Sequence, residues 1–154
     1  NKTAMVICDV YNSNGKALLS ISPRNLLKEQ VQKLGELGFI AKSASEIEYY
    51  LFNTSEKLSE LNVDHIRNYL SAPHSEDYHI LQTSRDEAFT QRARNYLEAS
   101  GIQVESSKGE CGFGQQEINL RYTNLLESVD QHAILKHALK EIAFQVDKNI
   151  LFCR

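Results

Sequence analysis

The segment Ser45–Phe52 carries two glutamates, Glu46 and Glu48, inside a run of β-branched and aromatic residues that is typical of a β-strand. Side chains two residues apart on a strand point to the same face, so the two carboxylates are predicted to project side by side. If that face also carries buried side chains, the pair repels itself and loses hydration. A cation or a basic group between the carboxylates removes that cost. The segment therefore predicts a strand at an ion-binding site.

A second pair of carboxylates, Glu110 and Glu117, encloses the sequence Cys111-Gly112-Phe113-Gly114-Gln115-Gln116. We expect a turn here, followed by a strand over 117–122. The two glycines and Gln115 would let the backbone approach a ligand, although an ordinary glycine turn is the alternative. Four carboxylates carried by two strand-borne segments form an oxygen-rich site that suits Mg²⁺ or Mn²⁺ and not zinc. Taken alone, Glu-x-Glu is also typical of a solvated strand edge.

Length, charge and cysteine content restrict the class of protein. At 154 residues the chain is long enough for one domain with a hydrophobic core. A net charge of −3 gives no basic surface for nucleic acid. No apolar run approaches the roughly 20 residues of a membrane span, and no charged-then-apolar leader opens the chain. The three cysteines are far apart and odd in number, which predicts reduced thiols and a cytoplasmic location.

Hydrophobic periodicity and turn residues divide the chain into strands and helices that largely alternate. Strands are expected over 5–11, 17–21, 39–53, 102–105, 117–122 and 149–152. Helices are expected from Pro23 to Gly38, over 64–70, from Ser84 to Gly101 and from Ser128 onward, with a surface excursion over 54–82 that turns at Pro73. The first two strands form a hairpin, and the strand at Glu117 returns. The sequence therefore predicts an α+β fold: a mixed, largely antiparallel sheet with helices packed on one side.

Sequence signals for helix starts are present before three of these helices. Ser22 precedes a proline at the first helical position. Capping-box patterns lie at 84–87 and 128–131. The last helix is predicted to bury a stripe of apolar residues at helical spacing, namely Ile134, Leu135, Ala138, Leu139 and Ile142.

Three motifs in sequence order carry a resemblance to a known family. They are Glu-x-Glu-Tyr-x-Leu-Phe at 46–52, Glu-x-x-x-Gly-Gln-x-Glu-Ile at 110–118 and Asp-x-x-x-x-x-Lys at 130–136. Together they resemble the catalytic domain of the glutamine synthetase superfamily. The stretch 107–122 is closer still to the members that join glutamate to organic amines. The resemblance extends over essentially the whole chain in the family's order.

The resemblance implies an ATP-dependent ligase that joins ammonia or an organic amine to the γ-carboxylate of glutamate through an acyl phosphate. By this resemblance Glu48, Glu110 and Glu117 are ligands of the Mg²⁺ or Mn²⁺ ion nearer the amino-acid substrate. Glu46 is a ligand of the ion nearer ATP, and Gln115 and Tyr78 are assigned to the cofactor side of the site. Tyr78 falls beside the family's ammonium or amine pocket, where its ring would face a cation. A packed surface tyrosine is the alternative.

The resemblance also implies that residues 1–154 are the front part of a longer catalytic domain. The family's N-terminal β domain would precede Asn1, and its histidine and arginine ligands would follow Arg154. The isolated chain is therefore predicted to be inactive, and its exposed apolar surface to favour self-association into a homo-oligomer. Cys111 and Phe113 replace a family tryptophan and proline, which could loosen the turn. The alternatives are a non-catalytic relative with a binding or assembly role and a plain metal-binding domain.

The remaining titratable residues are interpreted as structural or exposed. His132 and His137 are five residues apart, so they lie on different faces of the expected helix, while His74 and His79 lack a third ligand. Asp130 and Lys136 match helix positions of the family, but a solvated face with a structural ion pair is the interpretation that we favour. No cysteine has an adjacent base that would support nucleophilic catalysis.

Overall fold

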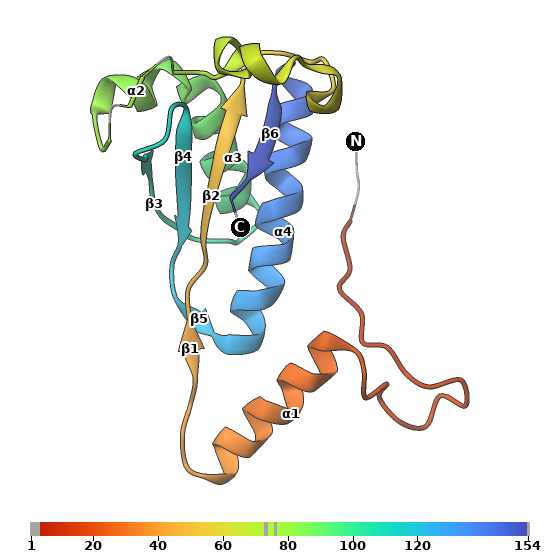
Figure 1. Cartoon of the computed structure of the whole chain (residues 1–154). Helices are drawn as coiled ribbons and strands as arrows, with labels where there is room; N and C mark the ends of the chain where they lie inside the picture. The colour runs from red at the N-terminus through yellow and green to blue at the C-terminus, as the bar shows by residue number, and fades with distance from the viewer. Residues whose placement is uncertain (1–3, 73, 76, 154) are drawn as a thin grey trace. The chain divides into compact units, whose positions relative to one another are not determined.

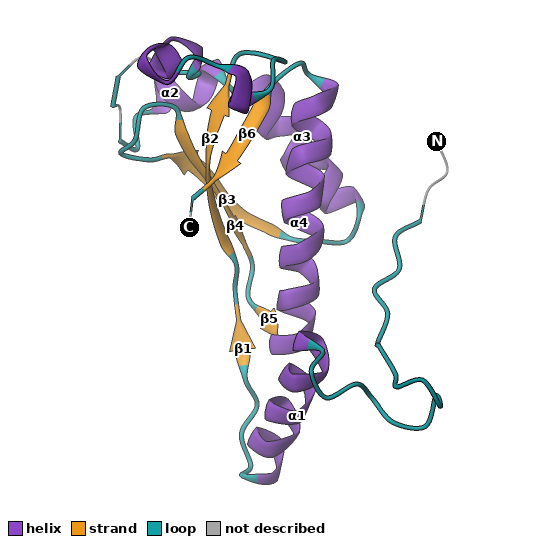
Figure 2. Cartoon of the chain, turned by 45° about the vertical axis from the view of Figure 1, so that its right-hand side comes forward, coloured by secondary structure: helices purple, strands orange, loops and turns teal. Residues whose placement is uncertain are grey.

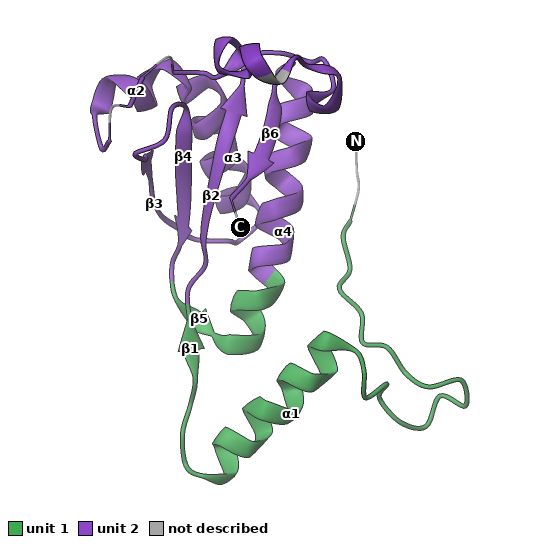
Figure 3. Ribbon diagram, viewed as in Figure 1, with its two compact units in different colours: residues 1–43, 122–130 green, residues 44–121, 131–154 purple. Residues whose placement is uncertain are grey.

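A computed structural model describes residues 4–72, 74–75 and 77–153. The chain divides into two compact units, one made of 1–43 and 122–130 and the other of 44–121 and 131–154 (Figure 3). The expected turn at Pro73 lies outside the described residues. No helix among the described residues is long and apolar enough to cross a membrane.

The larger unit is built on an antiparallel sheet of four strands in the order β3-β4-β2-β6 (Figure 1). The strands are β2 (Glu46–Phe52), β3 (Val104–Gly109), β4 (Gln115–Leu120) and β6 (Asn149–Phe152). β2 is central and pairs antiparallel with both β4 and β6. The sequence prediction for the last strand, 149–152, agrees with β6 residue for residue.

Two long helices of the larger unit, α3 (Glu87–Ala99) and the main part of α4 (Leu125–Gln145), lie on the same side of the sheet (Figure 2). Strand alternation turns every second side chain of β2 toward them, and the predicted apolar stripe of α4 packs there. The core side chains shared by these elements include Ile47, Tyr49, Leu51, Phe89, Leu97, Ile118, Leu135, Leu139 and Ile142. The α+β class with helices on one side of an antiparallel sheet is thereby confirmed.

The strand carboxylates share their face of the sheet with buried side chains, as expected, because Phe52 on β2 is 3% exposed and Glu117 on β4, opposite Glu48, is 2% exposed. Ile47 and Tyr49 are buried toward the helices, whereas Glu46 is exposed and Glu48 is half-buried. The glutamates therefore point to the face that the two helices leave open. Because the helix-facing side of β2 is apolar and the other side carries Glu46 and Glu48, a register shift by one residue would turn both carboxylates toward the helices, which holds the register in place.

The shorter elements of the larger unit form the predicted excursion between β2 and α3. They are two 3₁₀ helices, Leu58–Glu60 and Val63–Tyr69, and the short helix α2 (Ile80–Arg85). The capping box predicted at 84–87 is wrong, because Ser84 lies inside α2 and its hydroxyl donates to the Ile80 carbonyl at 3.0 Å. α3 begins instead after Asp86, whose side chain is buried against the core.

The smaller unit contains α1 (Pro23–Glu36), the strand pair β1 (Lys42–Ser43) and β5 (Thr123–Asn124), and the start of α4. α1 begins at the predicted proline, and Gly38 takes the left-handed conformation just beyond its end, with φ of 82°. Asp130 forms an ion pair with Arg24 at 2.7 Å, as the structural interpretation of Asp130 expected. The second capping box is wrong, because α4 already begins at Leu125, directly after β5.

The N-terminal hairpin expected at 5–11 and 17–21 is reduced to a single bridge. Tyr11 pairs with Leu18 around the predicted turn, and residues 5–10 have no regular structure. The side chains of Met5 and Val6 are 56% and 76% exposed. A two-stranded β-ribbon that has no third strand and no buried face is only marginally stable. The strand propensity of residues 5–11 alone is therefore not enough to form a regular strand.

A buried carboxylate in the core provides the first testable prediction. Asp86 is 2% exposed, and its oxygens approach Lys148 at 3.5 Å and Gln116 at 3.4 Å. Replacing Lys148 with methionine keeps the aliphatic stem but removes the only ammonium that an ion pair brings to Asp86 among the described residues. We expect the free energy of unfolding to fall by about 3–5 kcal/mol, measured by urea denaturation. A Lys57→Met control, at an exposed site, should change it by less than about 1 kcal/mol. An equal loss in both variants would contradict the prediction.

Candidate metal centre on the open face of the sheet

The strand register places charged side chains in one row across the open face. Glu48 on β2 pairs with Glu117 on β4, and Glu117 pairs in turn with Lys108 on β3. In the neighbouring row Glu46 pairs with Asn119. Side chains directly opposite each other on antiparallel strands are about 4.5–5.5 Å apart at Cβ, so sequence-distant residues meet here.

Three carboxylates converge in these two rows. One oxygen each of Glu46, Glu48 and Glu117 lies within 4.8 Å of the other two. Glu117 is 2% exposed, and its Oε1 accepts a hydrogen bond from Asn119 Nδ2 at 2.7 Å. Glu48 Oε2 accepts one from Gln115 Nε2 at 2.8 Å. Glu48 and Glu117, which the resemblance assigns to one ion together with Glu110, thus lie beside Glu46, whereas Glu110 is outside this group of three.

Lys108 is the basic group of this cluster, and sequence analysis assigned it no role. Its Nζ lies 2.9 Å from Glu117 Oε1, 3.4 Å from Glu110 Oε1 and 4.0 Å from the centre of the Tyr78 ring. Glu110 is thereby joined to Glu117 through a shared ammonium. The two-residue spacing of Lys108, in β3, and Glu110, directly after its end, was a usable signal, because extended backbone places such side chains on one side.

The two carboxylates that share Lys108 have pKa values shifted in opposite directions. A hydrogen bond with Glu117, together with burial, raises the pKa of Glu110 against the effect of Lys108. Burial also acts to raise the pKa of Glu117, but the hydrogen bonds from Lys108, Glu110 and Asn119 outweigh it and lower the pKa. The two carboxylates therefore titrate as a pair, with the pKa of Glu110 shifted up and that of Glu117 shifted down.

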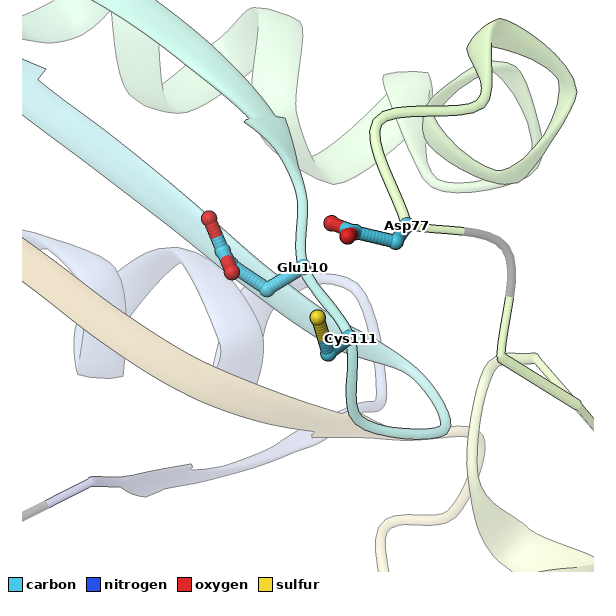
Figure 4. A group of neighbouring side chains, drawn as sticks. All are labelled: Asp77, Glu110 and Cys111. Carbon is cyan, nitrogen blue, oxygen red and sulfur yellow. The ribbon is translucent and has the colours of Figure 1, made fainter.

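Glu110 also belongs to a second cluster, at the turn between β3 and β4. Figure 4 shows Asp77, from the segment before α2, beside Glu110 and Cys111. One ligand atom of each of the three lies within 4.8 Å of the others. A hydrogen bond with Asp77, together with burial, raises the pKa of the Cys111 thiol, so the thiol stays protonated near neutral pH. Because Asp77 lies in the irregular segment, no sequence signal connected it with Glu110.

Tyr78 and Gln115 were predicted on the cofactor side of the site, and the structure places Gln115 against Glu48 and Tyr78 against Lys108. Tyr78 is 59% exposed with its ring against Lys108, and its φ of 55° is uncommon for a residue other than glycine. The Gln115 side chain bridges the turn to β2: its Oε1 accepts from the Gly112 amide at 2.9 Å, and its Nε2 donates to Glu48. The turn and the Glu48 carboxylate are thus positioned by one amide group.

A cavity of about 230 Å³ adjoins Glu46 and Glu48. Its other lining residues are Ile47, His132, Lys136, Phe152 and Cys153. His132 Nδ1 contacts Ser45 Oγ at 2.5 Å, and Lys136 Nζ lies 5.1 Å from the centre of the Phe152 ring. His132 thus has a structural partner, as expected, whereas Lys136 contacts an aromatic ring instead of forming the expected ion pair among the described residues; both side chains border the carboxylate site.

The turn between β3 and β4 provides the second testable prediction. A Cβ on Gly112 would lie 2.5 Å from Gln115 Oε1 and 2.6 Å from Tyr50 Oη. Gly112→Ala is therefore expected to push Gln115 away from Glu48, to cost about 1–3 kcal/mol of stability and to weaken Mn²⁺ binding about 10–100-fold. Gly35→Ala is the matched control, because a Cβ there meets nothing within 4 Å. Thermal unfolding and Mn²⁺ titration measure both effects, and wild-type binding in Gly112→Ala would contradict the role of Gln115.

The donor set fits a hard divalent cation. It consists of carboxylate oxygens, one of them on the buried and ionised Glu117, with amide donors that fix two of the carboxylates. An ammonium already lies against Glu117 and Glu110, which shows that this part of the cluster accepts positive charge. The carboxylate-lined open face of the antiparallel sheet is thus a candidate centre for a hard divalent cation.

Comparison with known proteins assigns the family. The chain matches the model of the glutamine synthetase catalytic domain over residues 20–154, and it belongs to the glutamine synthetase family. It is 36% identical to gamma-glutamylethanolamide synthetase of Streptomyces coelicolor over 151 residues, which is 97% of this chain and 32% of that protein. It is 36% identical to glutamate–isopropylamine ligase of a Pseudomonas species over 143 residues, which is 92% of this chain and 30% of that protein.

Solved structures agree on the fold. A cryo-EM structure of Plasmodium falciparum glutamine synthetase matches with a TM-score of 0.73 and 20% identity, covering 94% of this chain and 32% of that one. The chain thus spans about a third of the length of the relatives that it matches. The predicted membership of the family is confirmed.

Proposed function

We propose that this chain is the front part of the catalytic domain of an ATP-dependent ligase that joins the γ-carboxylate of glutamate to ammonia or an organic amine. The observation that carries the proposal is the convergence of Glu46, Glu48 and Glu117 on the open face, with Glu110 joined to them through Lys108. Family membership supports the reaction class. One relative at 36% identity is named for a γ-glutamylethanolamide product, and the other is named for an isopropylamine substrate. These names favour an organic amine as the nucleophile.

The proposed reaction has two transfers. The γ-carboxylate of glutamate attacks the terminal phosphorus of ATP, the bond to ADP breaks, and γ-glutamyl phosphate forms. The amine then attacks the γ-carbonyl carbon, phosphate leaves with the bonding electrons, and the amine loses a proton. Mg²⁺ or Mn²⁺ would supply neutralisation of charge on the phosphoryl oxygens.

The residues of this chain have distinct roles in that proposal. Glu48, Glu110 and Glu117 would hold the ion nearer glutamate, and Glu46, at the outer edge of the cluster, would hold the ion nearer ATP. Gln115 would keep Glu48 oriented, because its amide is fixed at both ends. Tyr78, whose ring contacts Lys108, would border the amine pocket.

Assembly into a homo-oligomer and a cytoplasmic location are part of the same proposal. The chain exposes apolar side chains on both units, including Ile21 at 78%, Ile40 at 84% and Phe144 at 82%. Apolar residues exposed to this degree are typical of surfaces that another part of a protein covers. Size-exclusion chromatography with light scattering of the longer protein tests the assembly.

Expression of the reading frame that contains this chain tests the function. Incubation with glutamate, ATP and Mg²⁺ and, in turn, ammonia, ethanolamine and isopropylamine should yield a γ-glutamyl product detectable by mass spectrometry. Glu117→Gln in the same protein should lower the rate by about 10²–10³, as for loss of one electrostatic stabiliser. A folded protein that binds ATP and Mn²⁺ but forms no product with any amine would support the non-catalytic alternative and overturn the ligase proposal.

A further inference from the structure

Lys108 occupies a position that a divalent ion would need. Its ammonium contacts Glu117 Oε1 at 2.9 Å and Glu110 Oε1 at 3.4 Å, which are oxygens of two proposed ligands. An ion bound to those oxygens with bonds of about 2.0–2.6 Å would lie beside this ammonium, and the two positive charges would repel each other. Either Lys108 moves when the ion binds, or the ion avoids this half of the cluster.

In the same conformation the ammonium has a third contact, the ring of Tyr78. The ring of Tyr78 has its centre 4.0 Å from Lys108 Nζ, within the range in which an aromatic face attracts a cation. The side chain of Lys108 is 36% exposed, so it has room to reorient, whereas Glu117 is 2% exposed and fixed by Asn119. Movement of the lysine is therefore easier than movement of the carboxylate.

We propose that Lys108 is a tethered cation that neutralises Glu110 and Glu117 in the ion-free protein, and that a divalent ion binds by displacing its ammonium from both carboxylates, so that the ring of Tyr78 is the contact that remains. This inference rests on the metal centre of the proposed function. The exchange keeps a buried carboxylate paired at every stage, since Glu117 is never left without a positive partner. It also lowers the affinity for the ion, because each binding event must break the contacts of Lys108.

Mn²⁺ titration calorimetry of the 154-residue chain and its variants tests the exchange. Lys108→Met keeps the length of the side chain and removes the competing charge, so Mn²⁺ should bind at least about tenfold more tightly than in the wild type. Lys108→Arg keeps the charge and should stay within about threefold of the wild type. Lys57→Met alters the net charge equally at an exposed site and should leave the affinity within about twofold.

Substitution of Tyr78 tests the exchange more strictly. Tyr78→Leu removes the contact that would remain for the displaced ammonium and should weaken Mn²⁺ binding about three- to tenfold when Lys108 is present. In the Lys108→Met background the same change should have no effect, because no ammonium needs the ring. This non-additivity distinguishes exchange from a general electrostatic effect of either side chain.

Thermal unfolding gives a readout that does not depend on calorimetry. Without Mn²⁺, Lys108→Met should unfold at a lower temperature than the wild type, because Glu117 lacks its partner; saturating Mn²⁺ should remove the difference. If Lys108→Met does not fold, the Mn²⁺ affinities of Tyr78→Leu and Lys108→Arg still test the exchange.

The outcomes separate this inference from the proposed function. If Mn²⁺ binding is lost in Glu48→Gln with Glu117→Gln but is no tighter in Lys108→Met than in the wild type, the exchange is wrong and the metal centre stands. Additive effects of Tyr78→Leu and Lys108→Met would also overturn the exchange. If binding persists unchanged in the double glutamine variant, the metal centre is elsewhere and both proposals fall.

Discussion

Replacing Glu48 and Glu117 together with glutamine is expected to weaken Mn²⁺ binding by more than about 100-fold, because changes to groups that only support metal ligands already cost about 10–100-fold. The two residues face each other on β2 and β4, and Glu117 is the buried, ionised member of the cluster. Glutamine keeps the shape and one oxygen of each side chain but removes two negative charges from the ion's surroundings. Titration calorimetry measures the affinity, and circular dichroism confirms that the variant is folded.

The matched control is Glu29→Gln with Glu56→Gln. Both residues are exposed, and the double change alters net charge by the same amount. Its Mn²⁺ affinity should stay within about twofold of the wild type, since exposed charges at a distance are screened by salt. Equal weakening in the two double variants would mean that Mn²⁺ responds to the net charge of the chain and not to the carboxylate cluster.

The isolated 154-residue chain is expected to release no phosphate above background with glutamate, ATP, Mg²⁺ and either ammonia or a polyamine. Phosphoryl transfer depends on fixed positive groups around the transferred phosphoryl, and each lost donor of this kind costs about 10²–10³ in rate. The cavity beside Glu46 and Glu48 is lined by no arginine among the described residues. The chain covers about a third of its relatives' length, so the proposed ligase has most of its residues elsewhere.

A coupled assay of phosphate release decides this prediction. The Glu48→Gln with Glu117→Gln variant serves as the background, because contaminating ATPases would act equally in both samples. Turnover in the wild-type chain that disappears in this variant would show that residues 1–154 suffice for catalysis. The proposal that the chain is only the front part of a catalytic domain would then be wrong.

Local sequence patterns determined the elements that carry the site. The period-two alternation of 46–52 fixed a strand with Glu46 and Glu48 on one face, and the structure has β2 over those residues. The apolar spacing from Ile134 to Ile142 fixed the buried side of α4. Such patterns predict elements correctly because one face of each element must be buried, and the residues of that face recur at a fixed spacing along the chain.

Helix starts and the N-terminal strand were not determined in this way. The capping boxes at 84–87 and 128–131 are genuine sequence patterns, yet the helices begin elsewhere. Asp86 is turned into the core toward Gln116 and Lys148, and α4 begins directly after the pairing of β5 with β1. Contacts of this kind exceed the roughly 1 kcal/mol that a cap contributes, so tertiary structure overrides the local signal.

The composition of the charged cluster was decided only by the tertiary structure. The sequence supplied Glu46, Glu48, Glu110 and Glu117 and, through resemblance, their order. It did not show that Lys108 lies between Glu110 and Glu117, or that Asp77 lies beside Cys111. Those neighbours depend on the register of β3 against β4 and on the path of the irregular segment before α2. Register and loop path are set by packing between residues far apart in the chain, which no local pattern encodes.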